Sequence, residues 1–522
     1  MVFTSLKFLI FITAVIFVYF IFPKKYRWIW LLISSYFFYL SASIKYAVFL
    51  VFSTVVTYAA ALGMDALSEK AAIHSLPKEE KKEARKRLEK RRKAVVAAAI
   101  VINFAVLFAL KYYNFTVTNI ASLMGAFGLE FSPVLSKLLL PVGISFYTFQ
   151  VTGYIIDVYR GMHGAQRNFL KYALFVSYFP QIMQGPIGRY SELSKTLYDG
   201  HPFEYDRMRR GLLRMMFGFF EKLVIADRLA IAVDAVWPNF ASYGRIELIV
   251  ICVFYAIQIY ADFAGYMDIA LGASEIMGIT LSENFKAPYF SASVPEFWRR
   301  WHITLGSWFR DYLFYPVMRS GFCTKLGKKL KAAFNQKTAG KVTTVIALLC
   351  VWFFTGMWHG ASWHYIAWGV YYGVLIILST LTAPAFDRFV QKHSINRDNP
   401  FYKAIQIIKT FALVCIGYIF FRSDGMTQAF GIIGRIFGFS APMLSPAALG
   451  LDMADIIAAL AAVLLLIIVD ICRAKDIDVR HTIAKQALVT RWVLYLLLLF
   501  SVIIFGVYGP GYASSSFIYF QF

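Results

Sequence analysis

Long apolar runs recur from one end of this 522-residue chain to the other, and they constrain the fold more than any other feature. Examples are residues 8–22, 28–40, 94–110, 456–469 and 492–507. A helix needs about 20 residues to cross roughly 30 Å of hydrocarbon, and flanking Tyr and Trp can complete a shorter run. With 59% hydrophobic and 18% aromatic residues, the chain is more apolar than a soluble domain. We therefore expect an all-α polytopic membrane protein with roughly 10 to 12 spans.

The net charge of +23 could suggest a nucleic-acid partner, but its distribution favours a membrane. Lysine and arginine concentrate in a few loops, at residues 24–27, 70–93, 325–341, 387–403 and 473–491. Basic loops remain in the cytoplasm, and placing these loops there gives a consistent topology with both chain ends outside. Membrane lipids are therefore the expected partners of these charges, and no nucleic acid is expected. The first apolar run lacks a small-residue cleavage site, which indicates a retained span.

We expect one membrane domain, residues 1–522, which the distribution of polar residues, glycine and proline divides into regions. Residues 1–112 resemble ordinary scaffold spans with a charged cytosolic loop at 69–93, and residues 373–522 form C-terminal spans. In residues 141–372, polar residues, glycine and proline interrupt the apolar sequence, which predicts broken helices. Irregular backbone at membrane depth is tolerated only where it is buried in protein or lines a cavity. The sequence therefore predicts that residues 141–372 form the catalytic core.

Two histidines in strongly aromatic surroundings are the strongest candidates for chemistry. His302 lies in FWRRWHITLG and His359 in TGMWHGASWH. Imidazole accepts and returns a proton near neutral pH, and ionisable groups at membrane depth usually serve a pathway or a reaction. Gly356 and Gly360 flank His359 and permit close approach of backbone or substrate. A histidine that is hydrogen-bonded at a helix end remains the structural alternative for both.

Charged and aromatic residues around the histidines are candidates for binding the substrate or the donor. Arginine beside tryptophan favours stacking and bidentate contacts with phosphate, although lipid anchoring explains such arginines equally well. The candidates are Trp298, Arg299, Arg300, Trp301, Arg310, Asp311, Trp358 and Asp262.

Asp262 and Asp268 are intramembrane carboxylates that could bind hydroxyls or relay protons. They stand six residues apart and so do not share one helical face. Asp262 lies one turn from Tyr266, and a structural hydrogen bond between these two side chains is the favoured interpretation.

Several motifs are absent, and their absence narrows the chemistry. The chain has no GxSxG, P-loop, HExxH or dinucleotide fingerprint, and its five cysteines lack metal-ligand spacing. We expect buried free cysteines, no metal and no bound cofactor. If the chain is a transferase, its donor must arrive already activated. A neutral imidazole then suits acyl transfer from a thioester to a hydroxyl.

The motifs resemble the membrane-bound O-acyltransferase superfamily, in particular its alginate O-acetylase-like bacterial branch. The resemblance runs from about residue 141 to the end, through LPVGISFYTFQ, FPQIMQGPIGRY, DFAGYMDIALG, NFKAPYFSASVPEFWRRWH, TGMWHGASWH and VYGPGYASSSFIYFQF. It implies a ring of transmembrane helices around a thin central layer, with an outer funnel and an inner donor tunnel that meet at the histidines. It also implies that His359 is catalytic and that His302 is its upstream partner.

The resemblance further implies a reaction across the bacterial cytoplasmic membrane. The donor would be a cytosolic thioester, either acetyl-CoA or an acyl-carrier protein. Either would suit the basic residues Arg319, Lys325, Lys328, Lys329 and Lys331. Positive-inside topology and anionic lipid are the alternative explanation of these residues. The acceptor would be an envelope polysaccharide, reached through a separate extracellular acetyltransferase. D-alanyl transfer toward teichoic acid is one alternative, and a proton-coupled transporter or flippase is another.

Overall fold

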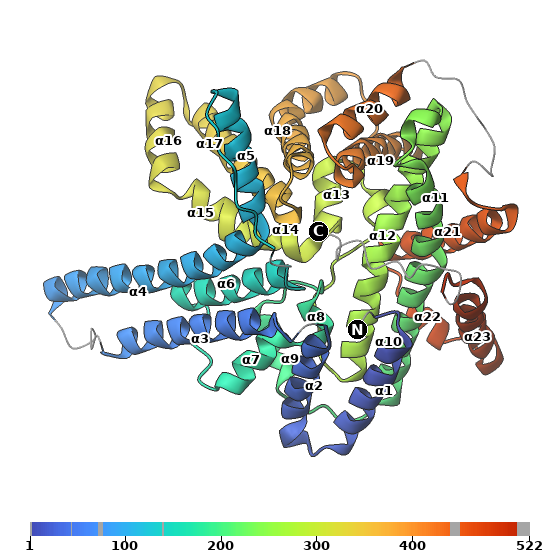
Figure 1. Cartoon of the computed structure of the whole chain (residues 1–522), viewed down its shortest axis with the longest axis horizontal. Helices are drawn as coiled ribbons and strands as arrows, with labels where there is room; N and C mark the ends of the chain where they lie inside the picture. The colour runs from blue at the N-terminus through green and yellow to red at the C-terminus, as the bar shows by residue number, and fades with distance from the viewer. Residues whose placement is uncertain (1–2, 43, 71–76, 138–139, 439–448, 509–522) are drawn as a thin grey trace. The chain divides into compact units, whose positions relative to one another are not determined.

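The structure is a computed structural model that describes every residue except 1–2, 43, 71–76, 138–139, 439–448 and 509–522 (Figure 1). The described residues form helices joined by turns and loops, and their one β feature is an isolated antiparallel bridge between Phe285 and Trp301. The predicted all-α class is therefore confirmed.

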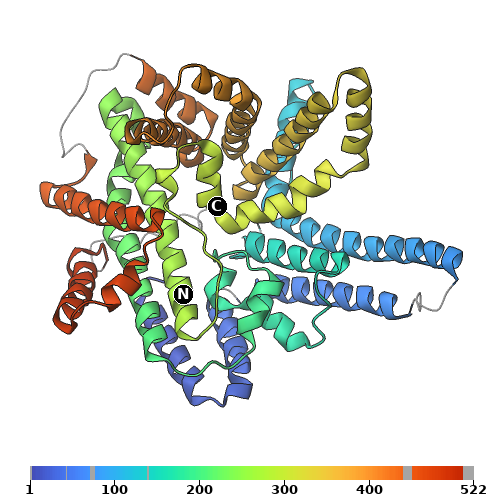
Figure 2. The ribbon, with the colours of Figure 1, turned by 180° about the vertical axis from the view of Figure 1, so that it is seen from behind.

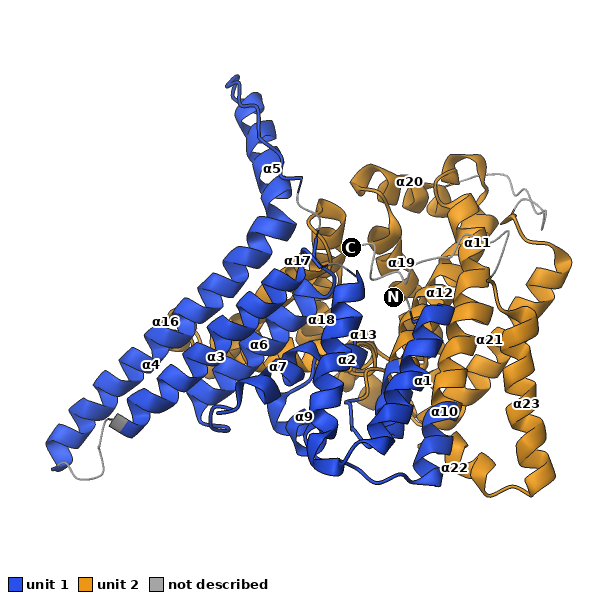
Figure 3. Cartoon of the chain, turned by 60° about the horizontal axis from the view of Figure 1, so that its bottom comes forward, with its two compact units in different colours: residues 1–212, 270–282 blue, residues 213–269, 283–522 orange. Residues whose placement is uncertain are grey.

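The chain divides into two compact units (Figure 3). Unit 1 comprises residues 1–212 and 270–282, and unit 2 comprises residues 213–269 and 283–522. The chain passes from one unit to the other within α10 (Tyr205–Phe219) and again within α12 (Arg245–Ile276).

The remaining helices of unit 1 are α1 (Leu6–Ile21), η1 (Lys24–Tyr26), α2 (Arg27–Ala42), α3 (Ala47–Lys70), α4 (Lys78–Leu107), η3 (Phe108–Tyr112), α5 (Tyr113–Ala126), α6 (Ile144–Arg160), α7 (Phe169–Ser177), α8 (Phe179–Ile182) and α9 (Tyr190–Leu197). Those of unit 2 are η4 (Phe220–Ala226), α11 (Asp227–Val236), η5 (Phe240–Ser242), η6 (Pro288–Phe290), α13 (Val294–Arg300), α14 (Ile303–Phe309), η7 (Arg310–Phe314), α15 (Tyr315–Met318), α16 (Gly321–Ala333), α17 (Gln336–His359), α18 (Trp363–Lys392), α19 (Pro400–Arg422), α20 (Met426–Phe437), α21 (Met453–Ala474), α22 (Val479–Ala484) and α23 (Leu488–Phe505).

Within unit 1, α3, α4 and α6 lie side by side, as Figures 1 and 2 both show. Residues 78–93 of the charged segment, which was expected as a cytosolic loop at 69–93, form the first half of α4, and Glu83 and Arg87 pair across one turn there. Such pairs on an exposed face stabilise a helix only weakly. The helix continues without a break into the apolar residues up to Leu107, so one helix carries both the polar segment and the span.

Eight helical segments of the described chain are long and apolar enough to cross a membrane. They are 47–69, 78–126, 245–276, 336–359, 363–392, 400–422, 453–474 and 488–505. The number is lower than the roughly ten to twelve expected by counting apolar runs. Two of those runs form α1 and α2, which have 16 residues each and are shorter than a full span. The chain is a multi-pass membrane protein.

A broken helix was expected within residues 260–290, and up to Ile276 this is wrong, because α12 runs without interruption from Arg245 to Ile276. The backbone leaves the helix only after Ile276. Glycine serves close packing here: a Cβ added to Gly265 would lie 2.7 Å from the carbonyl oxygen of Gly218. The polar residues in the helix are tolerated because charged side chains from neighbouring elements pair with them, as described below.

The helix that carries His359 packs unusually close to the next one. A Cβ on Gly356 of α17 would lie 2.4 Å from the carbonyl oxygen of Tyr365 in α18. Facing it, a Cβ on Gly369 would lie 2.3 Å from the carbonyl oxygen of Trp352. Gly356 was expected to permit close approach of backbone or substrate, and the structure shows close approach of the α18 backbone. This contact fixes the end of α17, three residues before its last residue, His359.

Candidate active site

His302 is held by a short pairing of two extended segments in unit 2. The Lys286 amide donates to the Arg300 carbonyl at 3.0 Å, and the Ile303 amide donates to the Asn284 carbonyl at 3.0 Å. The isolated bridge between Phe285 and Trp301 lies between these two hydrogen bonds. As a result, the residues on either side of His302 are tied to the loop that follows α12.

The backbone of His302 itself adopts the left-handed conformation, with φ 45° and ψ 53°. This region is sparsely populated by residues other than glycine, asparagine and aspartate, and its cost is of order 1–3 kcal/mol. Residues held in this way concentrate at functional sites, where the surrounding structure determines them. The conformation turns the chain from α13 into α14 and leaves the imidazole 2% exposed.

Asn284 fixes the ring of His302. Its side-chain oxygen Oδ1 accepts from the Thr304 amide at 3.0 Å and from the Thr304 hydroxyl at 2.9 Å, and it lies 3.3 Å from His302 Nδ1. The backbone N–H of Thr304 can only donate, so the Asn284 atom facing it is the oxygen. His302 Nδ1 must therefore carry the proton in this contact, which leaves the lone pair on Nε2.

Burial keeps this imidazole uncharged. It lowers the pKa of His302 to about 3, because a charged ring would lose its hydration. At neutral pH the ring is the free base, which is the form that accepts a proton or attacks a carbonyl.

His359 is the last residue of α17 and is 4% exposed. Its ring makes edge-to-face contacts with Trp358, Trp368 and Phe421, at centroid distances of 4.9, 4.8 and 5.1 Å. The indole of Trp358 also contacts the ring of His302, with centroids 5.9 Å apart. The structure thus brings the two histidines, 57 positions apart in the sequence, to the same tryptophan.

The residues around FWRRWH divide into a packed set and a charged set. Trp298 contacts Trp352 and Tyr372, with ring centroids 4.8 Å apart in both cases. Trp301 is 2% exposed and stacks on Phe297. Both tryptophans therefore belong to the aromatic core of unit 2, and their predicted role in binding stays a prediction.

The charged set is paired or exposed. Arg300 forms an ion pair with Glu296 at 2.7 Å, and Arg310 pairs with Asp311 at 3.0 Å. Arg299 lies on the exposed face of α13. Donor binding by these three arginines stays a prediction.

Asp262 lies in a buried ion pair. Lys222 Nζ is 2.6 Å from Asp262 and 2.8 Å from Asp227, and the Lys222 and Asp262 side chains are almost completely buried. A substrate contact for Asp262 stays a prediction, but this ion pair already explains a carboxylate at that position. Asp268 faces other partners, in agreement with the six-residue spacing.

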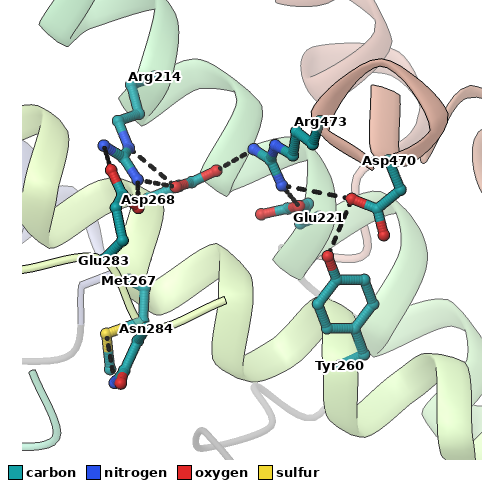
Figure 4. Close-up of polar contacts among 9 residues, drawn as sticks. All are labelled: Arg214, Glu221, Tyr260, Met267, Asp268, Glu283, Asn284, Asp470 and Arg473. Carbon is teal, nitrogen blue, oxygen red and sulfur yellow. Dashed lines mark hydrogen bonds and ion pairs between the residues drawn. The ribbon is translucent and has the colours of Figure 1, made fainter. Parts of the chain in front are cut away.

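Two arginines converge on Asp268 in unit 2 (Figure 4). Arg214 Nε donates to one carboxylate oxygen at 2.9 Å, and Arg473 donates to the other at 2.9 Å. Arg214 also binds Glu283 through two hydrogen bonds of 2.7 and 2.6 Å. Arg473 lies 3.6 Å from Asp470, whose carboxylate accepts from Tyr260 at 3.0 Å. Asn284 lies beside this network, and its amide donates to Met267 Sδ at 3.5 Å.

The sequence did not reveal Asn284, Arg214 or Arg473 as parts of a site. Asn284 is separated from His302 by 18 positions, and Asp268 from Arg473 by 205. No periodicity connects residues at such distances. The only available signal was the position of Asn284 in the NFKAPYF motif.

The fold and the site together define a multi-pass membrane protein with two buried histidines whose rings both contact Trp358. The sequence model of the membrane-bound O-acyltransferase family matches residues 163–421, which include Asn284 and both histidines. The probable alginate O-acetylase of Pseudomonas syringae pv. tomato is 33% identical over 447 residues, 85% of this chain and 77% of its own length. The chain belongs to the membrane-bound O-acyltransferase family and is an O-acyltransferase.

Two further relatives are named for another polymer, and one of them also for another acyl group. The peptidoglycan O-acetyltransferase of Helicobacter pylori is 28% identical over 446 residues, 80% of this chain and 75% of its own length. The teichoic acid D-alanyltransferase of Bacillus subtilis is 29% identical over 282 residues, 54% of this chain and 68% of its own length.

Proposed function

We propose that this enzyme moves an acetyl group, or a similar small acyl group, from a cytosolic thioester across the membrane for O-acetylation of an envelope polysaccharide. The observation that carries the proposal is the match to an alginate O-acetylase over 85% of the chain. The D-alanyltransferase match covers only 54% of the chain, so acetyl transfer is favoured over D-alanyl transfer. Membership in a family of acyltransferases likewise favours an enzyme over a transporter.

In the proposed reaction, His359 acts on the acceptor hydroxyl. The hydroxyl oxygen attacks the thioester carbonyl carbon, and the imidazole accepts the hydroxyl proton as the new C–O bond forms. The C–S bond then breaks, and the departing thiolate takes that proton back from the imidazolium. General-base catalysis of this kind contributes about 10²–10⁴-fold in rate. A route in which His359 itself carries the acyl group also needs an unprotonated nitrogen.

His302 is proposed as the partner of His359. The Nδ1–H contact with Asn284 directs its lone pair to Nε2, and its low pKa keeps that lone pair available at neutral pH. The indole of Trp358, which contacts both rings, would shape the space in which the thioester meets the acceptor. Asn284 is a positioning residue in this account, because it acts through His302.

We further propose that a donor tunnel from the cytosol and a funnel from outside meet at the histidines, within the bacterial cytoplasmic membrane. The donor would be acetyl-CoA or an acyl-carrier protein, and basic residues of α16 such as Lys325, Lys328 and Lys329 would attract either. Positive-inside topology explains the same lysines, so their charge alone does not distinguish the two roles. A separate extracellular acetyltransferase would pass the acyl group to the polymer.

The test is to identify the ester that depends on this protein. Base-labile esters on envelope glycans are released and measured by mass spectrometry, from cells with the gene, without it and with it restored. The proposal predicts that acetyl esters disappear without the gene and return with it. Loss of D-alanyl esters would assign the enzyme to the teichoic acid reaction, and an unchanged ester profile would contradict both.

A further inference from the structure

Unit 2 contains a cavity of about 690 Å³ to which the proposed reaction assigns no role. Its walls come from α10, α12, the loop after α12, α21, α22 and α23. Pockets for small organic ligands have volumes of roughly 300–1,000 Å³, so this cavity is large enough for a substantial part of a lipid.

The lining changes from apolar to charged along one helix. Leu465, Val469 and Arg473 of α21 all line the cavity, and they follow one another at intervals of four residues. Such residues lie on one face of a helix, with a rise of about 1.5 Å per residue. Leucines of α23, among them Leu494 and Leu498, extend the apolar wall. A ligand that fits both parts is an amphiphile.

The charged part of the lining is balanced. Four basic residues line the cavity, Arg214, Lys286, Arg473 and Arg480, together with four acidic ones, Asp268, Glu283, Asp476 and Asp478. Arg214 and Asp268 form a buried pair, and Arg214 also pairs with Glu283, whose side chain is exposed. The Lys286–Asp476 pair, at 2.7 Å, is exposed, so its two charges can exchange one partner for a ligand. This balance fits a head group with one positive and one negative charge better than a purely anionic one.

The position of the apolar wall indicates where the ligand comes from. Both α21 and α23 are candidate spans, and none of the α23 residues is buried within the protein. Their outer faces would therefore contact lipid hydrocarbon, and the apolar ligand reaching the cavity is a membrane component. The charged end of α21 leads into the basic segment 473–491, the side on which a phospholipid head group would lie.

We propose that this cavity binds one zwitterionic phospholipid with a primary ammonium group. Its phosphate would approach Lys286 and Arg480, its ammonium Asp476, and an acyl chain would lie along Leu465 and the α23 leucines. This site does not depend on the proposed acetylation reaction. Asn284 also lines the cavity, so the lipid would lie against the residue that holds His302.

The experiment is native mass spectrometry of the full chain after extraction from vesicles with equal amounts of phosphatidylethanolamine and phosphatidylglycerol. Two matched pairs of variants fill or spare the cavity. Leu465→Trp and Leu498→Trp place an indole in it, whereas Leu464→Trp and Leu499→Trp change adjacent exposed residues outside the lining. Thermal melting of each variant verifies that it is folded.

The proposal predicts that the unaltered protein retains one phosphatidylethanolamine, about tenfold in excess over phosphatidylglycerol. This adduct should disappear from folded Leu465→Trp or Leu498→Trp protein and persist in both controls. If the fillers do not fold, displacement of the lipid by Lys286→Glu in an otherwise folded protein is the second test. Three results would overturn the proposal. The protein could retain phosphatidylglycerol in preference to phosphatidylethanolamine, the filler variants could retain as much lipid as the controls, or no lipid adduct could be present.

Discussion

The side-chain oxygen of Asn284 lies 3.3 Å from Nδ1 of His302 and accepts two further hydrogen bonds from Thr304. One amide oxygen therefore fixes both the tautomer of the imidazole and the turn that carries it. Asn284 is 1% exposed, so removing its side chain would take a buried acceptor away from both residues.

Asn284→Ala should reduce ester formation roughly tenfold or more per folded protein, because it frees the imidazole to adopt the other tautomer. It should also lower the free energy of unfolding by about 1–3 kcal/mol, since the Thr304 amide loses its acceptor. Ester content, normalised to folded protein, is compared with thermal melting. Asn284→Asp restores the acceptor and should recover activity, but with an acid limb moved to higher pH, because a carboxylate favours imidazolium. Wild-type activity in Asn284→Ala would show that Asn284 does not position His302.

The stability of the protein should depend on pH through His302. Its pKa is lowered to about 3 in the folded protein, whereas the unfolded chain binds a proton near pH 6.5. The unfolded state therefore binds more protons between these values, and stability falls as the pH falls from about 6.5, by up to about 1.4 kcal/mol per pH unit. The test measures thermal melting in detergent for wild type and His302→Asn. The pH runs from roughly 7.5 to 4.5, which covers the upper part of the range in which stability should fall. An identical pH dependence in both proteins would contradict this assignment.

The buried ion pair predicts a structural effect for Lys222 and Asp262. Lys222→Met leaves Asp262 and Asp227 buried without their cation, which should cost about 3–5 kcal/mol of unfolding free energy. The exposed pair between Arg397 and Asp387 is the control, and Arg397→Met should cost less than about 1 kcal/mol. In Asp262→Asn, ester formation per folded protein should be unchanged. A selective loss of activity in folded Asp262→Asn protein would instead support a substrate contact.

Two glycines of α17 should respond in opposite directions to the same change. Gly356→Ala places a methyl group 2.4 Å from the Tyr365 carbonyl oxygen and should destabilise the protein by about 1–3 kcal/mol. Gly340→Ala meets no atom within 4 Å and should stabilise the helix by about 0.5–1 kcal/mol. Melting temperatures of the two variants test this. Equal effects would show that the contact between α17 and α18 does not control their packing.

The sequence predicted the elements that depend on local pattern. Apolar runs predicted helices and membrane spans, and the aromatic setting of His302 and His359 marked them as candidates for chemistry. The five cysteines are free, as expected; Cys252, Cys323 and Cys415 are also buried as expected, whereas Cys350 and Cys472 are partly exposed.

The sequence did not predict features that depend on pairing between distant residues. The polar residues of α12 suggested a broken helix, but Lys222, Arg214 and Arg473 pair with them and the helix continues. The left-handed backbone of His302 depends on contacts with Asn284, which local propensity does not encode. The sequence pattern singled out both histidines, the resemblance to a known family implied their roles, and the three-dimensional structure added the asparagine.

The central claim is that His359 carries the acyl transfer, and one comparison tests it most directly. Base-labile acetyl esters on envelope glycans are measured by mass spectrometry in cells with wild type, His359→Ala or, as a control for expression, His393→Ala on the exposed end of α18. Membrane-inserted protein is matched between strains. We expect the acetyl esters to disappear only in His359→Ala. Wild-type amounts of ester in that variant, with the protein folded, would contradict the catalytic role of His359.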